Sequence, residues 1–372
     1  MTSENSKDTQ EPKEAIQIKC ESCGGAMVYA PRVRKLECIY CGSTKELSLQ
    51  PAAIHENDYL KWLNDSEDEQ QNTEREHYVE TQQIKCEQCG ATVTVDETKS
   101  STKCPYCGTP LILEQKQVRR FWKPEYLLPF AVDKKDCGTI FNKWLDGKWF
   151  LSSKYKHGNV LANNFQGVYY PYWTYDASTR TSYSGMKAVD THVVRKGPDG
   201  KTYTTTQRNW YPVSGVIRRD FDDILVPASR NLNTSILAGL GNWQLNQLVT
   251  YSPEFTAGFT TDVYTVSFKD GAQVAQRIMD NVIERDIRND IGGNAQEITG
   301  KHTSYNNVMF KHILLPLWVG AFKIEDKTYQ FVINGYSGKV YGEYPKDKLK
   351  IALVVIAVII VLYLLFYILS NG

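Results

Sequence analysis

Eight of the nine cysteines in this 372-residue chain occur in four Cys-x-x-Cys pairs, and thiolate sulfur is a strong ligand for soft metal ions. The four pairs are Cys20 with Cys23, Cys38 with Cys41, Cys86 with Cys89, and Cys104 with Cys107. Each cysteine of the first two pairs recurs 66 positions later in the last two, and fourteen residues separate the inner cysteines in both sets. Two thiolates from each of two short turns match the tetrahedral coordination of Zn²⁺. We therefore predict two structural zinc sites.

A glycine follows the second cysteine of every pair (Gly24, Gly42, Gly90 and Gly108). Glycine readily adopts positive φ, which lets the backbone wrap around a metal-bound sulfur. The strand-like stretches at 26–29 and 92–95 are too short to bury a core, so metal binding must supply much of their folding free energy. Disulfides or redox-active pairs are the alternative, but they require an oxidising compartment or a thioredoxin-like unit, which the sequence lacks. The ninth cysteine, Cys137, is expected to be a buried or inert thiol.

The segment 351–369 contains nineteen residues without a charge. A helix of that length covers about 28 Å, close to the thickness of bilayer hydrocarbon. Three lysines precede the segment, Lys346, Lys348 and Lys350, and no basic residue follows it. The positive-inside rule then places the N-terminal bulk in the cytoplasm. Because the first residues are hydrophilic and contain no signal peptide, we expect a single-pass, tail-anchored protein of the cell membrane.

The composition divides the chain into six parts. We predict a disordered start (1–15), zinc ribbon 1 (16–49), an acidic solvated linker with a short helix near 59–63 (50–83), zinc ribbon 2 (84–114), an α+β domain (121–345) and a transmembrane helix (351–369). Residues past 121 are rich in aromatic and apolar side chains, as expected of a packed domain. The predicted fold is thus two small zinc ribbons, an α+β domain with an antiparallel sheet, and one C-terminal transmembrane helix.

Within the α+β domain, apolar periodicity predicts helices at 135–150, 235–248 and 272–290. Alternating segments predict strands, and the turn residues 197–200 predict a hairpin between 186–195 and 201–210. Three further strands are expected at 315–324, 329–334 and 339–344, joined by tight turns at 325–327 and 335–338. The aromatic residues 169–175 suit either a stacking platform or a sheet core, and alternating large rings favour the core.

Sequence motifs of catalysis are missing. The glycine–lysine pairs at Gly300-Lys301 and Gly338-Lys339 lack the spacing and hydroxyl of a Walker A motif, and the sequence contains neither H-E-x-x-H nor G-x-S-x-G. The six histidines form no metal-ligand pair at helical spacing and are expected at the surface or in packing: His55, His77, His157, His192, His302 and His312. Four thiolates per zinc leave no open position for a catalytic water. We expect no enzymatic activity and no catalytic residues.

The order of these features resembles a known family. The cysteine ribbons, the stretches GVYYPYWTYDA, LLPLWVGAF and YQFVINGYSGKVYGEYP, and the terminal apolar span are similar to bacterial tail-anchored double zinc-ribbon proteins of the YdjG type. Related single-ribbon sequences carry the labels TFIIB-type zinc ribbon protein and primosomal protein N-prime (superfamily II helicase)-like. The resemblance implies a membrane anchor for a cytosolic or peripheral partner linked to the phage-shock-protein A envelope-stress response, alongside a band-7-like protein.

Two functions follow as hypotheses. The first is a non-enzymatic adaptor that recruits a cytosolic protein to the inner face of the membrane; the second is a membrane-associated nucleic-acid-binding ribbon protein. The chain has a net charge of +1, and each ribbon carries an excess of only two basic residues, which is weak beside the basic footprint of a nucleic-acid module. Arg119 and Arg120 with Lys116 suit a contact with phosphate or anionic lipid, or a solvated basic linker, and the linker is favoured. The charge balance favours the adaptor.

Overall fold

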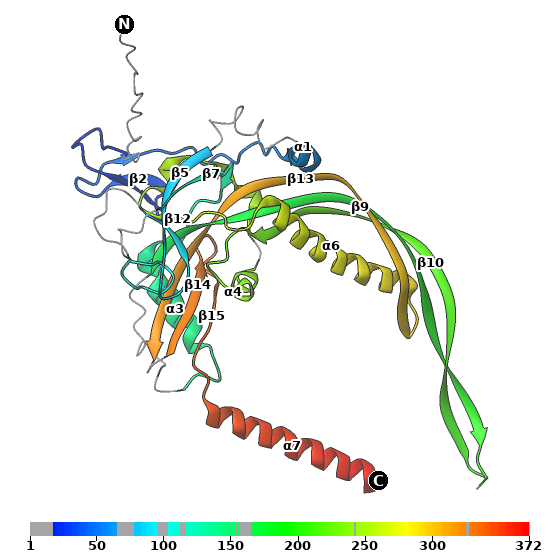
Figure 1. Cartoon of the computed structure of the whole chain (residues 1–372). Coiled ribbons are helices and arrows are strands. Elements are labelled where there is room, and N and C mark those ends of the chain that lie inside the picture. The colour runs from blue at the N-terminus through cyan, green and yellow to red at the C-terminus, as the bar shows by residue number, and fades with distance from the viewer. Residues whose placement is uncertain are drawn as a thin grey trace.

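The computed structural model describes residues 18–64, 78–95, 103–111, 117–152, 155, 165–198, 200–241, 243–324 and 327–371. The predicted disordered start, 1–15, most of the acidic part of the linker and the turn at 325–326 lie outside the described residues. The described chain folds into two small three-stranded sheets that contain the cysteines, one large sheet with helices on it, and an apolar helix that leaves the body (Figure 1).

The large sheet is built on three long antiparallel strands, β9 (Gln166–Lys196), β10 (Thr202–Pro227) and β13 (Ala295–Ile324). Its main order is β10-β9-β13-β14-β15, where β14 is Lys327–Asn334 and β15 is Val340–Gly342. Short strands extend it: β4 (Asn57–Asp58), β8 (Tyr126–Leu127), β11 (Val249–Thr250) and β12 (Thr260–Thr261). The strands of the main order pair antiparallel, as predicted. The short strands β8 and β12 run parallel to β13 and β9, so the whole sheet is mixed.

Both faces of this sheet are buried around the C-terminal half of β13 and around β14. Side chains alternate between faces along a strand, and β13 accordingly sends Ile313, Leu315 and Leu317 into one core and Leu314 and Trp318 into another. Ribbon 2 packs into the first core and ribbon 1 into the second. The two ribbons therefore lie on opposite faces of the sheet.

The aromatic stretch at the start of β9 is part of this core. Tyr169 belongs to the core that contains ribbon 1, Tyr170 and Tyr172 to the core that contains ribbon 2, and Trp173 and Tyr175 to a third core under α6. All five side chains are buried. The prediction of a sheet core for this stretch is confirmed, and these rings do not form an exposed stacking platform.

The longest helix of the domain is α6 (Phe268–Ile291), which contains the predicted segment 272–290. The Ser267 hydroxyl accepts a hydrogen bond from the Asp270 backbone at its start, and Gly292, with φ of 66°, ends it. Its buried residues recur every four positions and pack on β9, β10 and β13: Gly271, Ala275, Met279, Ile283, Ile287 and Ile291. The segment was predicted correctly, but of the apolar residues whose spacing predicted it Ile287 is buried, Val274 and Val282 are half-buried and Ile278 is exposed.

The other predicted helices are shorter than expected. Helix α3 (Lys134–Asp146) ends at Gly147 and not at 150. The helix predicted over 235–248 is wrong as one element, because Gly241 has φ of +75° and separates α4 (Thr234–Gly239) from a 3₁₀ turn, η3 (Leu245–Gln247). A one-turn helix, α5 (Pro253–Thr256), follows.

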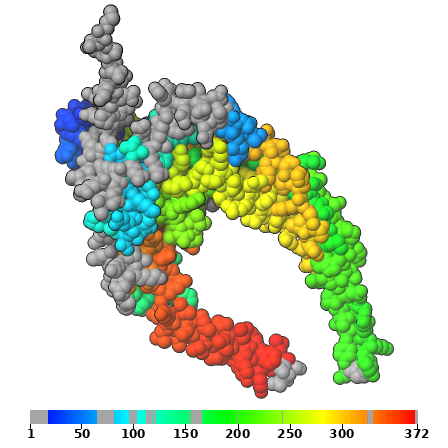
Figure 2. Space-filling model, in the orientation of Figure 1, coloured from blue at the N-terminus to red at the C-terminus, as the bar shows by residue number. Residues whose placement is uncertain are grey.

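The predicted hairpin is present and much longer than its turn signal indicated. The strands pair from Thr202–Lys196 at the turn to Pro227–Tyr172 at the base. Since β13 begins at Ala295, opposite Ala188, the two strands beyond that point form a two-stranded arm. This arm projects far from the body (Figures 1 and 2).

The segment 50–64, predicted as part of a solvated linker, is docked on the large sheet. Strand β4 pairs with β13, and helix α1 (Tyr59–Asn64), near the predicted short helix, follows it. The ring of Trp62 stacks on Trp122 with centroids 4.1 Å apart. The prediction of a solvated linker failed for this segment because its two aromatic residues, Tyr59 and Trp62, pack against the buried core under α6. Residues 65–77 lie outside the described chain.

The strands of ribbon 1 lie within the predicted 16–49, whereas the sheet of ribbon 2 extends past its predicted limits. Ribbon 1 contains β1 (Met27–Ala30), β2 (Lys35–Cys38) and β3 (Thr44–Lys45). Ribbon 2 contains β5 (Tyr78–Lys85), β6 (Thr92–Val95) and β7 (Gln117–Trp122) in the order β6-β5-β7. The predicted range of ribbon 2, 84–114, was therefore too narrow, since β5 begins before its first cysteine and β7 follows its last. Strand β7 also crosses position 121, where the α+β domain was predicted to begin.

Helix α7 (Lys348–Asn371) leaves the body as a separate rod (Figures 1 and 2). Among the described residues it is the one helix long and apolar enough to cross a membrane, over Lys348–Leu369, and none of its apolar window is buried in the protein. Its start is tied to the body, because the Asp347 backbone donates to Phe150 O at 2.8 Å and Lys350 Nζ donates to Leu151 O at 2.7 Å.

A pair of helical glycines tests the packing of α6. A β-carbon at Gly271 would collide with the Tyr175 hydroxyl and approach Trp173 Cδ1 to 3.0 Å, whereas one at Gly138 in α3 would meet nothing within 4 Å. We expect Gly271→Ala to lower the free energy of unfolding by about 1–3 kcal/mol and the control Gly138→Ala to raise it by about 0.5–1 kcal/mol. Urea unfolding followed by tryptophan fluorescence measures both changes. Equal stabilisation by the two substitutions would contradict this packing.

Candidate metal centres

The structure brings each predicted cysteine quartet together. In ribbon 1 the Sγ atoms of Cys20 and Cys41 are 3.6 Å apart and those of Cys23 and Cys38 are 3.5 Å apart. In ribbon 2 the corresponding pairs, Cys86 with Cys107 and Cys89 with Cys104, are both 3.6 Å apart. All four sulfurs of each quartet lie within 4.8 Å of one another.

These separations fit zinc. Four sulfurs at about 2.3 Å from a tetrahedral Zn²⁺ lie about 3.8 Å from one another, whereas a disulfide would require about 2.05 Å. All nine cysteines are free. Each quartet is therefore suitable for one structural Zn²⁺ held by four thiolates, which fill all four positions of a tetrahedral site.

Four equivalent turns position the sulfurs. In each, the backbone N–H of the glycine after the second cysteine donates to the carbonyl of the first cysteine, at 2.8–3.0 Å. These glycines have φ between 73° and 77° (Gly24, Gly42, Gly90 and Gly108). The left-handed conformation folds the chain back toward the metal without a β-carbon penalty, which is the role that the sequence predicted for them.

The surroundings of the last cysteine in each quartet favour the thiolate. Hydrogen bonds from the Ser43 hydroxyl and backbone lower the pKa of Cys41 to about 6. Burial opposes ionisation of Cys107, but hydrogen bonds with the Thr109 hydroxyl and backbone lower its pKa to about 7. Because the thiolate is the metal ligand, these hydrogen bonds favour the metal-binding form of Cys41 and Cys107.

Ribbon 2 is locked to the large sheet through a buried carboxylate. Tyr106, between Cys104 and Cys107, is 1% exposed, and its hydroxyl donates to Asp262 Oδ2 at 2.6 Å. Ser229 Oγ donates to the same oxygen at 3.0 Å, and Asn231 Nδ2 donates to Oδ2 at 2.9 Å. Burial raises the pKa of Asp262 to about 6 against these hydrogen bonds, so the carboxylate accepts them at neutral pH.

A second contact fixes the other end of ribbon 2. The Thr92 backbone N–H donates to Asn231 Oδ1 at 3.0 Å, and Asn231 Nδ2 donates to Thr92 O at 2.8 Å. Gln330 Nε2 on β14 donates to Tyr106 O at 3.2 Å. Residues from β14, from the end of β12 and from the loop before α4 thus hold one face of the ribbon.

Ribbon 1 docks through its first strand instead. The Tyr29 backbone donates to Ala257 O at 3.0 Å, and its hydroxyl donates to Phe130 O at 3.1 Å. The Tyr29 ring contacts Phe255 edge-to-face with centroids 5.6 Å apart. The second Cys-x-x-Cys turn of ribbon 1 takes no part in these contacts.

A third cluster was not visible in the sequence. Glu56, Asp176 and Asp223 bring their carboxylates within 4.8 Å of one another, and the ammonium of Lys311, 3% exposed, binds Glu56 and lies 2.6 Å from Asp223 Oδ1. Burial and the hydrogen bond with Glu56 raise the pKa of Asp176 to about 7. Lysine therefore supplies the cation here, and the cluster holds β4 to the sheet.

Two further titratable side chains, those of Cys137 and His312, are buried in the protein core. Cys137 is fully buried, as predicted, and burial raises its pKa to about 12. His312 is buried against Trp173, 4.6 Å between ring centroids, and burial lowers its pKa to about 4. Lys116, His77 and His157 lie outside the described residues, and the side chains of Arg119 and Arg120 are not described.

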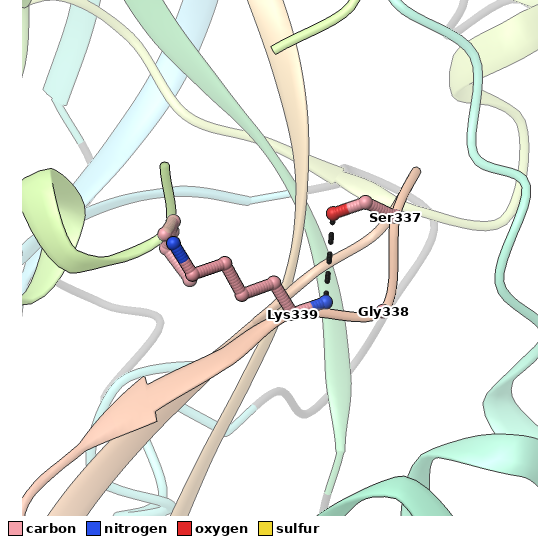
Figure 3. Close-up of a pocket in the computed structure, with 4 residues that line it drawn as sticks. Ser337, Gly338 and Lys339 are labelled. Atoms are coloured by element: carbon pink, nitrogen blue, oxygen red, sulfur yellow. Dashed lines mark hydrogen bonds between the residues drawn. The ribbon is translucent and has the colours of Figure 1, made fainter. Parts of the chain in front are cut away.

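A hollow of about 440 Å³ is lined by Leu240, Ser337, Gly338 and Lys339. Figure 3 shows the Lys339 side chain extending from the turn between β14 and β15 toward the end of α4, with its backbone nitrogen 3.5 Å from Ser337 Oγ. The Gly338-Lys339 pair thus lies in a strand-to-strand turn, and Gly300-Lys301 lies within β13. Neither precedes a helix, as a phosphate-binding loop requires.

Comparison with known proteins gives a distant relative. The chain is 23% identical over 230 residues, 62% of its length, to the uncharacterized protein YdjG of Bacillus subtilis (strain 168), and the match spans 66% of that protein, just under two thirds. This distant homology agrees with the resemblance seen in the sequence. No family model and no solved structure matches.

Removal of one thiolate tests the metal sites. We expect protein purified under reducing conditions to contain about two zinc ions per chain, and Cys38→Ser or Cys104→Ser to contain about one, because three thiolates hold the ion far less tightly. The control Cys137→Ala, outside both quartets, should keep both ions. Elemental analysis of the purified chains decides the outcome. A zinc content unaffected by Cys38→Ser and Cys104→Ser would contradict the proposed ligands.

Proposed function

We propose that this protein is a non-enzymatic, membrane-anchored zinc-ribbon adaptor that recruits a cytosolic protein to the inner face of the cell membrane. The observation that carries the proposal is the combination of α7, whose apolar window has no protein surface to cover it, with two rigid ribbons fixed to one sheet. An anchor and a rigid surface are what recruitment requires, since confinement raises the effective concentration of a bound partner.

The chemistry of the clusters supports binding over catalysis. Each cysteine quartet supplies all four ligands of a tetrahedral zinc, which leaves no position for a reacting water. In the acidic cluster, Lys311 occupies the place of a cation. Among the described residues, the polar side chains that line the hollow in Figure 3 are Ser337 and Lys339, which offer no acid–base pair.

The flanks of α7 support the orientation. Lys346 and Lys348 are exposed at its start, where anionic headgroups attract basic side chains, while Lys350 holds the first turn to the body. In the proposed topology α7 crosses the membrane once and the body stays in the cytoplasm. The sequence resemblance adds an envelope-stress role, with a band-7-like or phage-shock-protein A-associated protein as partner.

Truncation tests anchoring and recruitment together. A chain that ends at Lys350 should become soluble and keep its fold, because the apolar window of α7 is not buried. Proteins that co-purify with the detergent-solubilised full chain should, when fluorescently labelled in cells, leave the membrane on this truncation. Cell fractionation and microscopy measure the two effects.

Two outcomes would contradict the proposal. Protease added outside intact cells should leave the ribbons uncut, and cleavage there would reverse the topology. A salt-sensitive, submicromolar affinity of the truncated chain for DNA or RNA at physiological ionic strength would favour a nucleic-acid role instead.

A further inference from the structure

The second Cys-x-x-Cys turn of each ribbon, called its knuckle below, carries two residues between the cysteines, and their exposure differs between the two ribbons. The 66-residue repeat places Ile39 and Tyr40 of ribbon 1 at the positions of Pro105 and Tyr106 of ribbon 2. Tyr106 is 1% exposed, whereas Tyr40 is 75% exposed and Ile39 is 59% exposed. The same structural position is therefore buried in one repeat and presented to solvent in the other.

Ribbon 2 shows what this position binds. Tyr106 belongs to the apolar core that also contains Leu237, Leu317 and Val319, and its hydroxyl donates to the buried carboxylate of Asp262. The knuckle thus fits a socket with apolar walls and a carboxylate acceptor at its base. Asp262 is already occupied by Tyr106, so this domain offers that socket to ribbon 2 alone.

The exposed knuckle of ribbon 1 is held in place. The Tyr40 ring lies against Gly25, where a β-carbon would collide with it; ribbon 2 has Ala91 at the matching position. The Ile39 backbone donates to Ala26 O at 3.3 Å. A tyrosine that is already positioned loses little conformational entropy on binding, and exposed tyrosines with apolar neighbours are common energetic centres of interfaces.

We propose that Ile39 and Tyr40 form the docking surface for the recruited protein, and that this partner presents an apolar socket with a carboxylate at its base. The proposal rests on the adaptor function and adds the surface and the chemistry of the partner. Ribbon 1 contacts its own domain through Tyr29, so its knuckle stays available while the ribbon remains docked.

Photo-crosslinking in living cells tests the surface. The full chain with p-benzoylphenylalanine in place of Tyr40 should crosslink to one protein of a different sequence, identified by mass spectrometry. The same substitution at Val33, an exposed apolar residue of the same ribbon (47%), should not give this product. Crosslinks to a second copy of this chain, to lipid or to nucleic acid, or no crosslink at all, would overturn the proposal.

Affinity measurements on the identified protein test the chemistry. Its dissociation constant for the full chain in detergent should rise about tenfold with Tyr40→Phe, which removes one hydrogen bond to a carboxylate, and about a hundredfold with Tyr40→Ser. Val33→Ser should change it less than about twofold, and all variants should keep both zinc ions. When the facing Asp or Glu of the partner is replaced, the wild-type chain and Tyr40→Phe should have the same dissociation constant.

The result separates this inference from the adaptor function. If the partner stays at the membrane and its affinity is unchanged by Tyr40→Ser, the adaptor function stands and the docking surface is wrong. If no cytosolic protein depends on this chain for its location, the adaptor function itself fails.

Discussion

The buried carboxylate of Asp262 is the constraint on which the arrangement of this protein depends. A charge removed from water is tolerated only where donors surround it, and the donors to Asp262 come from Tyr106, Ser229 and Asn231. One of them belongs to a zinc ribbon and two to the domain. Tyr106 therefore fixes ribbon 2 to the domain at this point, because a shift of its hydroxyl would remove one donor from the buried carboxylate.

The large sheet and the ribbons complete each other. Strand β13 has apolar side chains toward both faces in LLPLWVGAF, so neither face can be left to water. Each ribbon is too small for a core of its own and contributes apolar residues to one of these faces. Zinc holds the ribbon in shape, and the sheet supplies the buried area, so the metal sites act as parts of the domain rather than as appendages on a linker.

The sequence predicted the features that depend on residues close together in the chain. The cysteine spacing identified both quartets, the four-residue recurrence of apolar residues identified α6, and the uncharged segment identified α7. Contacts between distant segments were beyond such patterns: Tyr106 with Asp262, Lys311 with Glu56, and Trp62 with Trp122 join residues separated by 60 to 255 positions. The linker and helix errors have the same origin, since docking of α1 and the break at Gly241 depend on the fold around them.

The most direct test of this account is a double-mutant cycle between Tyr106 and Asp262, measured by urea unfolding of the chain that ends at Lys350. If the pair fixes ribbon 2 to the sheet, Tyr106→Phe and Asp262→Ala should each destabilise the fold, and their coupling energy should be about 1.5–3 kcal/mol, as for a hydrogen bond to a charged group. Effects that add within about 0.5 kcal/mol would show that the ribbon is held by other contacts and would contradict the central role of this carboxylate.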